Sequence, residues 1–476
     1  MQMKSLWSSL LILSTIIMLL LLYFLKTEKG HKELKHFLEN YLSQETYNKI
    51  KVKSLNINHY PYITVKLQIN DRAEIILKGE ISNYTIDMHY HLKGNSFYFN
   101  NFHLDDKIDV EGTLLGKFDH LMVKGEGELF KGKIVYQFIN TPKAIKDLVI
   151  KTKKTDIQKI SEFLKEQSFI SGLADIDAKF KSFSSYSKYG RVDVSMKSAI
   201  INNLEKYPSQ LESTVIFENI NYRFQLDIAT NSLGRVSLHN GFYYVRKKSI
   251  LSDYTLYIKS LEPFQKESNH QYHGSVDING NLTYNTSSNK LLIKGQTQQF
   301  KGDINFLYQE DNLYIKLKKV PLEYILKELS YPILFTSNIY GIISVNLKDK
   351  SVIANLNLKD TYFISSSLTQ SIEDTIGLNL LDEVYDKSHF SVGYQNSELS
   401  SLLKIDSGKN YIKLSKTKIN ILDGKINSKL EININGQSIY GTIYGNVENP
   451  QFKVHKGSFI QYKTDRFLSK HLGTKE

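Results

Sequence analysis

The sequence predicts a mainly β protein, in which an N-terminal transmembrane helix is followed by an elongated, curved antiparallel sheet with a few short amphipathic helices. Three observations predict this fold class. Residues 6–25 form an uncharged apolar run, apolar and polar residues alternate along most of the remaining chain, and two segments of that remainder share the same motifs in the same order. We expect the repeated segments to build a groove.

Composition narrows the function classes. The chain has 476 residues, of which 41% are hydrophobic and 23% are charged, which is typical of a folded protein. It contains no cysteine, so thiol nucleophiles, disulfides, cysteine-ligated zinc and iron–sulfur clusters are excluded. The net charge of +12 indicates an anionic partner, either nucleic acid or a phospholipid surface.

The apolar run at the N-terminus favours the phospholipid surface. Twenty residues at about 1.5 Å each span roughly 30 Å, the thickness of the hydrocarbon core of a bilayer. A cleaved signal peptide is the alternative, but its apolar region has only about 7–15 residues and ends at small residues. We therefore expect a retained single-span anchor. Its representative residues are Leu6, Trp7, Leu10, Ile16, Leu20, Tyr23 and Leu25.

The side of the membrane on which the large domain lies stays open at this point. Only Lys4 precedes the span, whereas Lys26, Lys29, Lys32 and Lys35 follow it closely. Read locally, the positive-inside rule places the large domain in the cytoplasm. Long domains, however, are translocated largely regardless of charge.

Three helices are predicted after the anchor. Residues 31–50 carry apolar residues at spacings of three and four, the period of one helix face, and would form a linker helix. Asp156 would cap a second helix by accepting hydrogen bonds from its first free N–H groups. Pro321 would open a third, at the position where its missing N–H costs nothing.

Elsewhere, apolar residues occupy every second position, the period of a strand with one apolar and one polar face. Asn279-Gly280 and Asn435-Gly436 are predicted as hairpin turns, because both residue types tolerate positive φ. A one-residue slip in register would invert every face, so the pattern alone does not fix which faces line a groove. The candidate lipid-binding strand faces consist of Ile63, Val65, Leu67, Ile69, Leu356, Leu358, Leu430, Ile432 and Ile434.

An internal repeat organises the strands. Phe130-Lys131-Gly132 corresponds to Phe300-Lys301-Gly302, and each is followed by a basic strand and then by one of the predicted helices. A segment that opens on glycine comes next, at Gly172 and at Gly341. Chance similarity among β sequences is the alternative. A repeated unit that stacks on itself builds an extended sheet with one continuous apolar face. The related units are residues 124–180 and 294–350.

These motifs resemble a known family. Residues 315–329, together with the alternating segment that opens on Gly341, are similar to a recurrent element of the AsmA-like family, which includes TamB and YhdP relatives. In that family a strand runs into a short helix near a Pro-Leu signature, and a glycine-opened hairpin follows. The stretch from Leu422 to Pro450 also resembles the closing strands of the family.

The resemblance implies an anchor in the inner membrane of a diderm bacterium, with the β domain in the periplasm. It further implies a groove for lipid acyl chains and a part in phospholipid transfer or outer-membrane assembly. The expected partners are phospholipid, the inner membrane and other envelope proteins, and no nucleic acid. The expected layout is a tail (1–5), the anchor (6–25), a linker helix (26–50), one repeat β domain (51–465) and a C-terminal tail (466–476).

No catalytic, cofactor or metal site is predicted, so we do not expect an enzyme. His89 and His91 share one strand face, but no third ligand stands nearby. The segment that begins with residues 277–281 superficially resembles a calcium loop, but it lacks the glycine at the sixth position of such a loop and the terminal glutamate. Three hypotheses remain open: a periplasmic lipid groove, an envelope scaffold with a closed β core and no lipid cargo, and a domain that faces the cytoplasm.

Overall fold

The computed structural model describes residues 27–472, apart from residues 47, 83, 100–101, 185, 203–205, 263–273, 329–332, 367–368, 371–372, 375–378, 421–422 and 447–448. The predicted anchor, residues 6–25, lies outside the described residues. Within the described ranges, every helix falls short of the length or the hydrophobicity that a membrane crossing requires.

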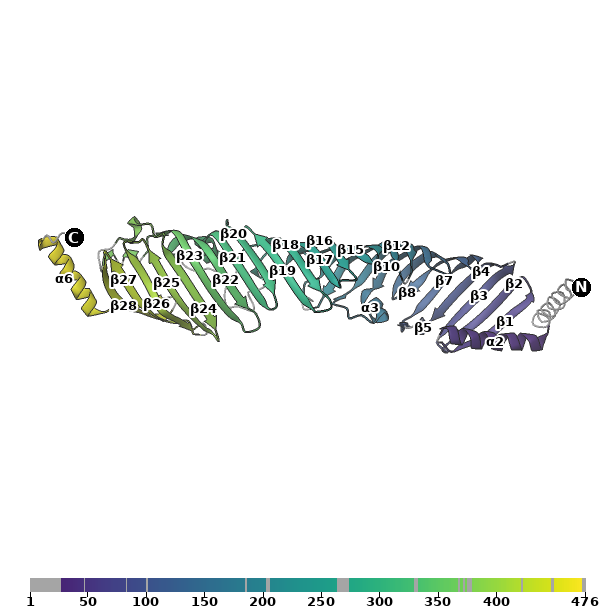
Figure 1. Cartoon of the computed structure of the whole chain (residues 1–476). Helices are drawn as coiled ribbons and strands as arrows, with labels where there is room; N and C mark the ends of the chain where they lie inside the picture. Colours follow the sequence, from purple (N-terminus) through teal and green to yellow (C-terminus); the bar gives the residue numbers. More distant parts are fainter. Residues whose placement is uncertain are drawn as a thin grey trace, which may run out of the picture. The chain divides into compact units, whose positions relative to one another are not determined.

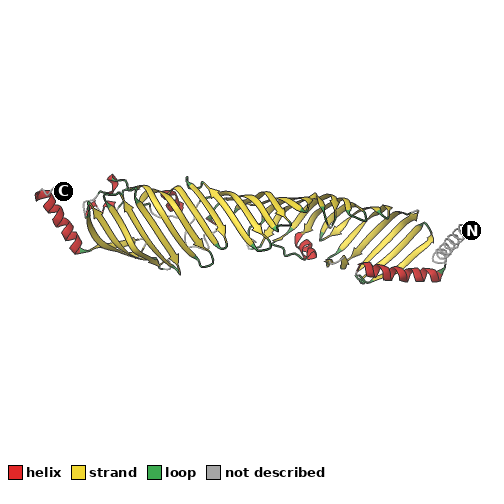
Figure 2. Cartoon of the chain, in the orientation of Figure 1, coloured by secondary structure: helices red, strands yellow, loops and turns green. Residues whose placement is uncertain are grey.

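Residue contacts divide the chain into two compact units. Unit 1 contains the residues up to Asn231 together with Asn240–Val245, and unit 2 contains Ser232–His239 and the residues from Arg246 onward. Strand β16 (Gly234–Tyr244) contributes residues to both units. In each unit the described strands form an antiparallel sheet, and helices are few (Figure 2). The prediction of a mainly β, antiparallel fold is therefore confirmed.

In unit 1, strands that follow one another in the chain are mostly neighbours in the sheet (Figure 1). Tight turns make this possible: Asn70 and Asp71, between two strands, both have positive φ (50° and 57°), as in a type I′ hairpin. Two short strands, β5 (Phe97–Phe99) and β6 (Phe102–Leu104), form a separate hairpin. The main strands are β1 (Ile50–His59), β2 (Tyr62–Ile69), β3 (Ala73–Ser82), β4 (Thr85–Gly94), β7 (Ile108–Lys117), β8 (His120–Leu129), β9 (Gly132–Asn140), β10 (Ile145–Asp156), β11 (Ile170–Ser171), β12 (Leu173–Phe183), β13 (Lys188–Ile201), β14 (Ser209–Asn219) and β15 (Asn221–Thr230).

Unit 2 is built in the same way. Asn435 and Gly436 form the predicted turn, with φ values of 48° and 86°. The other predicted turn is wrong, because Asn279 and Gly280 lie inside a strand, where glycine permits close strand approach: a Cβ on Gly280 would lie 1.9 Å from the carbonyl oxygen of Lys294. The strands are β17 (Ser249–Ile258), β18 (Val276–Asn285), β19 (Lys290–Thr297), β20 (Asp303–Gln309), β21 (Asn312–Pro321), β22 (Phe335–Asn346), β23 (Ser351–Phe363), β24 (Ser388–Gln395), β25 (Glu398–Asp406), β26 (Tyr411–Asn420), β27 (Lys425–Ile434), β28 (Gln437–Asn446) and β29 (Asn449–Val454).

Helix α2 (Glu28–Thr46) is the predicted linker helix, and it lies beside the first strands (Figure 1). It ends earlier than predicted, because Ile50 already begins β1. The helix caps the edge of β1: the N–H of Val52 donates to Glu39 Oε1 (2.8 Å), and the N–H of Ile50 donates to Ser43 Oγ (3.0 Å). An exposed strand edge would otherwise offer these N–H groups to another chain.

The other helices follow strands. Helix α3 (Ile157–Leu164) has Asp156 as its N-cap, as predicted, and the carboxylate accepts from the N–H of Gln158 at 3.0 Å. Helix α4 (Leu322–Glu328) follows Pro321, which is the last residue of β21 and not the first of the helix. Helix α6 (Lys456–Leu472) is not predicted from the sequence, and it crosses the domain boundary expected at residue 465.

The two related segments have the same order of elements. In unit 1, β8, β9 and β10 lead into α3, the two-residue strand β11 and then β12; in unit 2, β19, β20 and β21 lead into α4 and then directly into β22. Lys154 and Lys319 have positive φ (54° and 53°) and occupy a bulge near the end of β10 and β21. The last sequence match differs: Gly172 precedes β12, whereas Gly341 lies within β22.

Candidate functional site

In unit 1, one side of the sheet carries a continuous row of mostly apolar residues, and we call this side the apolar face. The row follows from register, because residues directly opposite each other in a ladder point to the same side of a sheet. It crosses the unit from β2 to β15. The row consists of Val65, Leu77, Tyr90, Gly112, Gly125, Tyr136, Ile150, Ala178, Val192, Val215 and Phe224.

Unit 2 has a corresponding row on its own apolar face. It begins, like the central part of the first row, with an aromatic residue, two glycines, an aromatic residue and isoleucine. This shared order extends the similarity of the two segments to the middle of each strand. The row consists of Tyr254, Gly280, Gly295, Phe306, Ile315, Ile343, Ala354 and Val392.

All nine candidate lipid-binding residues lie on the apolar faces of their units, but protein already covers most of them. Side chains from the helices pack on this face: Leu38 and Leu42 from α2, Leu322 and Ile325 from α4, and Phe459 and Tyr462 from α6. Six of the nine are buried beneath these contacts, and Ile63, Val65 and Ile434 remain half-buried. The six are Leu67, Ile69, Leu356, Leu358, Leu430 and Ile432.

The middle of the apolar face in unit 1 is less covered. Leu114 lies opposite Val123, which lies opposite Phe138, so the three form a second apolar row beside the first. They are half-buried, as is Leu77, and they lie outside the buried hydrophobic clusters of the described residues. Helix α3 covers only a neighbouring part of the face, where Phe163 packs on Phe130 with ring centroids 5.6 Å apart. We call Leu77, Leu114, Val123 and Phe138 the open patch.

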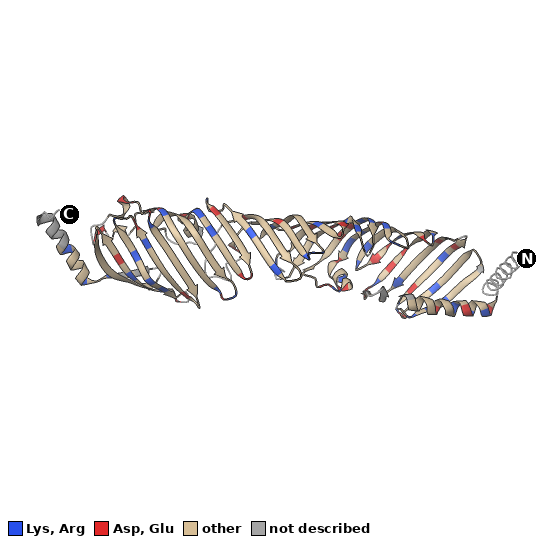
Figure 3. Ribbon diagram, in the orientation of Figure 1, with Lys and Arg blue, Asp and Glu red and all other residues tan. Residues whose placement is uncertain are grey.

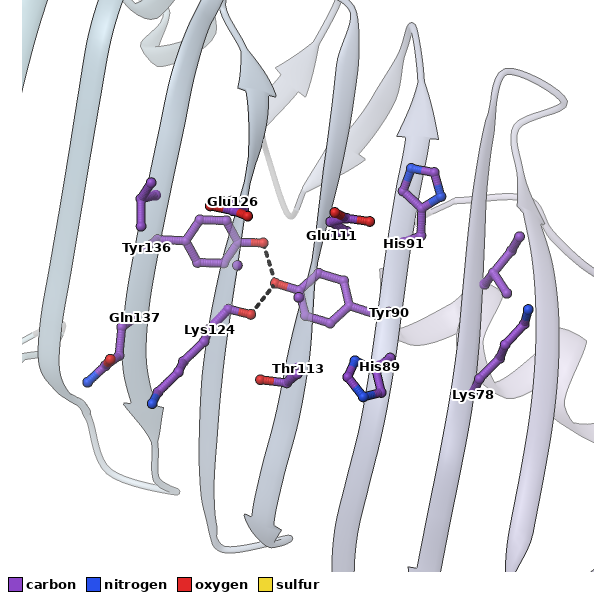
Figure 4. Close-up of a pocket in the computed structure, with 14 residues that line it drawn as sticks. Lys78, His89, Tyr90, His91, Glu111, Thr113, Lys124, Glu126, Tyr136 and Gln137 are labelled. Atoms are coloured by element: carbon purple, nitrogen blue, oxygen red, sulfur yellow. Dashed lines mark hydrogen bonds between the residues drawn. The ribbon is translucent and has the colours of Figure 1, made fainter.

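Two tyrosines lie over two glycines in the central row of unit 1. A Cβ on Gly125 would lie 2.3 Å from Tyr90 Oη and 2.6 Å from Tyr136 Cζ, so only glycine leaves room for both rings. The Tyr90 hydroxyl donates to the carbonyl oxygen of Lys124 (3.1 Å) and is hydrogen-bonded to the Tyr136 hydroxyl (Figure 4). Burial raises the pKa of both phenols, so both stay neutral at physiological pH.

The opposite, polar face has a hollow of about 620 Å³ behind this cradle of glycines and tyrosines. Two rows of polar side chains line it, on either side of the tyrosines (Figure 4). One row contains His91, Glu111 and Glu126, so two carboxylates face each other on neighbouring strands. The other row consists of Lys78, His89, Thr113, Lys124 and Gln137.

His89 and His91 share the polar face, as expected from their spacing. The Nε2 atom of His91 is 2.7 Å from Asp109 Oδ1, and this hydrogen bond is the main cause of the lowered pKa of Asp109. Within the ranges that the structure describes, no group of three or more histidine, cysteine, aspartate or glutamate residues is arranged to hold a metal ion.

The corresponding hollow on the polar face of unit 2 measures about 710 Å³. Its cradle contains Gly295, where a Cβ would lie 2.3 Å from Phe306 Cζ and 2.4 Å from Tyr254 Oη. Phe306 has no hydroxyl, and the buried Tyr254 hydroxyl has no hydrogen-bond partner in the described part of the chain. The lining also differs, because neutral amides stand where unit 1 has carboxylates.

The open patch and both cradles are absent from the residues predicted as a site. The apolar character of Leu114, Val123 and Phe138 was available in the sequence, but which residues the helices cover depends on contacts between distant segments. The glycines Gly112 and Gly125 are the signal that could have located the first cradle, since an isolated glycine inside a strand pattern indicates a close approach of another group.

Comparison with known proteins identifies no relative. No family model, no curated protein and no solved structure matches the chain.

Proposed function

We propose that the two units hold phospholipid acyl chains along their apolar faces, with the open patch of unit 1 as the principal contact. The observation that carries this proposal is the open patch, whose side chains stay only half-buried at the middle of a continuous, mostly apolar face from β2 to β15. A sheet with one apolar face needs a second layer or a ligand to cover it. Acyl chains meet that need without any polar partner.

The polar faces support the same orientation of the lipid. Along the described strands of both units, lysine and arginine are interspersed with aspartate and glutamate (Figure 3). Such a mixed surface favours contact with water. Acyl chains would therefore lie on the apolar side, and lipid headgroups would remain in water at its rim.

The membrane anchor, the compartment and the mode of lipid movement are also part of the proposal. The uncharged run at residues 6–25 would hold the chain in the inner membrane, with both units in the periplasm. The resemblance to the AsmA-like family supports this placement and a part in phospholipid transfer or outer-membrane assembly. Lipid would then move by diffusion along the apolar face, because no catalytic step is needed.

Crosslinking from neighbouring residues of one strand tests the acyl-chain proposal. A photoreactive phenylalanine analogue at Val123 projects from the apolar face, and the same analogue at Lys124 projects from the polar face. We expect phospholipid adducts at Val123 and none at Lys124, detected by mass spectrometry of the full chain irradiated in cells. Equal labelling at both positions, or none at Val123, would contradict the proposal.

An envelope scaffold with a closed β core is the second candidate function. The burial of six of the nine predicted lipid contacts beneath helices favours it. In that case, an aspartate at Val123 should destabilise the fold as much as an aspartate at the buried Leu358, because both would be core positions. A lipid track instead predicts a folded Val123→Asp protein that retains no lipid.

A reporter fused after Glu476 tests the compartment. A periplasmic signal is expected, and the reporter must be compared with the same fusion to a protein of known topology. A cytoplasmic signal would end the proposal of transfer between membranes.

A further inference from the structure

The polar face of unit 2 has a second feature that the acyl-chain proposal does not use. Two adjoining hollows, of about 710 and 790 Å³, share Asn279, Gln296 and Asn305 as lining residues. The three residues lie in one row, because Asn279 is opposite Gln296 and Gln296 is opposite Asn305. Neighbouring strands are about 4.8 Å apart, so the row places amide groups at regular intervals across β18, β19 and β20. We call these three residues the amide row.

Most of the hydrogen-bonding capacity of this region is unused. The side chains of the amide row are exposed, and its internal bond runs from Gln296 Nε2 to Asn279 Oδ1 (2.9 Å). The side-chain amides of Asn281 and Asn305 form no hydrogen bond within the described residues. Each amide offers an acceptor oxygen and two donor hydrogens in one plane.

A second row beside the first supplies an apolar surface. Asn281 is opposite Lys294, Lys294 is opposite Leu307, and Leu307 is opposite Tyr314. Tyr314 is 44% exposed, and Ile342, which lines the same hollow of about 710 Å³, is 53% exposed. An exposed aromatic ring beside free amides combines a flat apolar contact with directional hydrogen bonds.

Comparison with unit 1 shows that the arrangement of glycines and aromatic rings does not require amide side chains beside it. Around its matching glycines, Glu111 and Glu126 stand where unit 2 has Asn279 and Gln296, and Val135 stands where unit 2 has Asn305. The backbone arrangement is shared, so the neutral amides at these three positions are a property of the unit 2 surface.

We propose that the amide row of unit 2 binds a neutral carbohydrate chain. Vicinal hydroxyl groups match the paired donor and acceptor of an amide, and the C–H face of a sugar ring packs on an aromatic side chain such as Tyr314. Nearby charges are few, with Lys294 and Lys316 against Asp253, Asp277 and Asp303, and the slight excess of carboxylates disfavours a polyanionic ligand. The site lies on the face opposite the proposed acyl-chain surface, so it is a separate binding activity.

Titration of the full chain with three neutral tetrasaccharides, chitotetraose, cellotetraose and maltotetraose, tests the proposal. We expect at least one of them to bind saturably, measured by ligand-observed NMR. The double variant Asn279→Ala/Asn305→Ala and the single variant Tyr314→Ala should each weaken that binding at least tenfold. The matched control is Glu111→Ala/Val135→Ala, at the corresponding exposed positions of unit 1, and it should bind as the unaltered chain does.

Folding is checked separately, because the altered side chains are exposed and their loss should leave the thermal unfolding midpoint unchanged. The variant Asn279→Asp/Asn305→Asp keeps the side-chain shape but removes the amide donors, and it should also lose binding. No binding of any tetrasaccharide, an unaffected double variant, or an equal loss in the unit 1 control would overturn the proposal. Binding of phosphatidylglycerol vesicles in place of sugar, abolished by Lys294→Ala, would do the same. None of these outcomes alters crosslinking at Val123, so failure here is distinguishable from failure of the acyl-chain proposal.

Discussion

The two cradles have the same backbone arrangement and different side-chain chemistry. In unit 1, Tyr90 and Tyr136 meet over glycine and share a hydrogen bond; in unit 2, Phe306 replaces the second tyrosine, and the Tyr254 hydroxyl has no hydrogen-bond partner among the residues that the structure describes. The glycines in both units admit an aromatic ring close to the backbone. The comparison teaches that this approach is fixed by glycine, whereas the polar groups around it are free to differ.

The starts of helices α3 and α4 also share a backbone position and differ in side-chain chemistry. Asp156 caps α3 through its carboxylate, whereas Pro321 occupies the corresponding position before α4. Lys131 forms an ion pair with Asp156 (2.9 Å), and Lys301 lies over the ring of Tyr324, 4.7 Å from its centroid. Each unit therefore begins its helix at the same place, but only unit 1 does so with a titratable group.

The largest expected effect comes from filling either cradle. Gly125→Ala and Gly295→Ala should each destabilise the fold by about 1–3 kcal/mol, because the new methyl group would overlap both aromatic side chains. Chemical denaturation of the full chain, with hydrogen exchange to locate the loss, measures this. The control is Gly393→Ala, whose Cβ would meet only Ser400 Oγ at 3.3 Å. If Gly125→Ala left the stability unchanged, the rings would have moved away at little cost, and glycine would not be required in the cradle.

The capping difference predicts a smaller change confined to unit 1. Asp156→Ala should cost about 1 kcal/mol, because it removes the acceptor for the first N–H groups of α3. The matched substitution Pro321→Ala should leave α4 much less affected. Hydrogen exchange in the two helices provides the measurement. If α3 keeps its protection in Asp156→Ala, packing of its apolar side chains, rather than the cap, holds the helix.

Low pH should reduce the stability of α3 more than that of α4. Burial raises the pKa of Asp156, but the hydrogen bond from Lys131 and those from the N–H groups of Lys159 and Gln158 outweigh it, so the pKa lies below its ordinary value of 3.8. A lowered folded-state pKa stabilises above the unfolded-state value, and this stability is lost as pH falls from there through the folded pKa. We expect α3 to lose exchange protection in that acid range, while α4 shows no comparable step. Simultaneous loss in both helices would point to general acid unfolding.

Exchanging the hydroxyl between the cradles should move stability in opposite directions. Tyr136→Phe should cost about 1 kcal/mol, and Phe306→Tyr should add about as much by giving the buried Tyr254 hydroxyl a partner. Thermal unfolding of both variants and of their combination measures the two changes. Destabilisation by Phe306→Tyr would mean that the second cradle lacks room for the oxygen.

The smallest expected effect concerns the polar face of unit 1. Glu111 and Glu126 stand directly opposite each other, and like charges in that position are unfavourable. Glu126→Gln, which copies the residue of unit 2, should therefore stabilise unit 1 by a few tenths of a kcal/mol, roughly the low end for a cross-strand pair. Added salt should reduce the difference between the two proteins, because exposed charges are screened. A difference that is unchanged in salt would assign the effect to something other than charge.

The sequence by itself determined the mainly β class, the alternation of strands such as β2, and the approximate positions of α2, α3 and α4. Period-two patterning at Ile63–Ile69 and the capping aspartate at residue 156 depend on neighbours in the chain, so local physics is enough to predict them. It also indicated the repeat, although Gly341 turned out to lie inside β22. The sequence did not predict α6, whose Tyr462 is buried against strands far from it in the chain.

Only the tertiary structure decided which apolar residues remain available. Leu67 and Val123 are both apolar residues followed by a polar one, and the sequence does not separate them, yet α2 packs over the first, and the second belongs to the open patch. Asn279-Gly280 looks like a turn, yet register places it within β18, opposite Gln296 and Gly295. Register and helix packing join segments far apart in the chain, and a pattern read from neighbouring residues contains no information on such contacts.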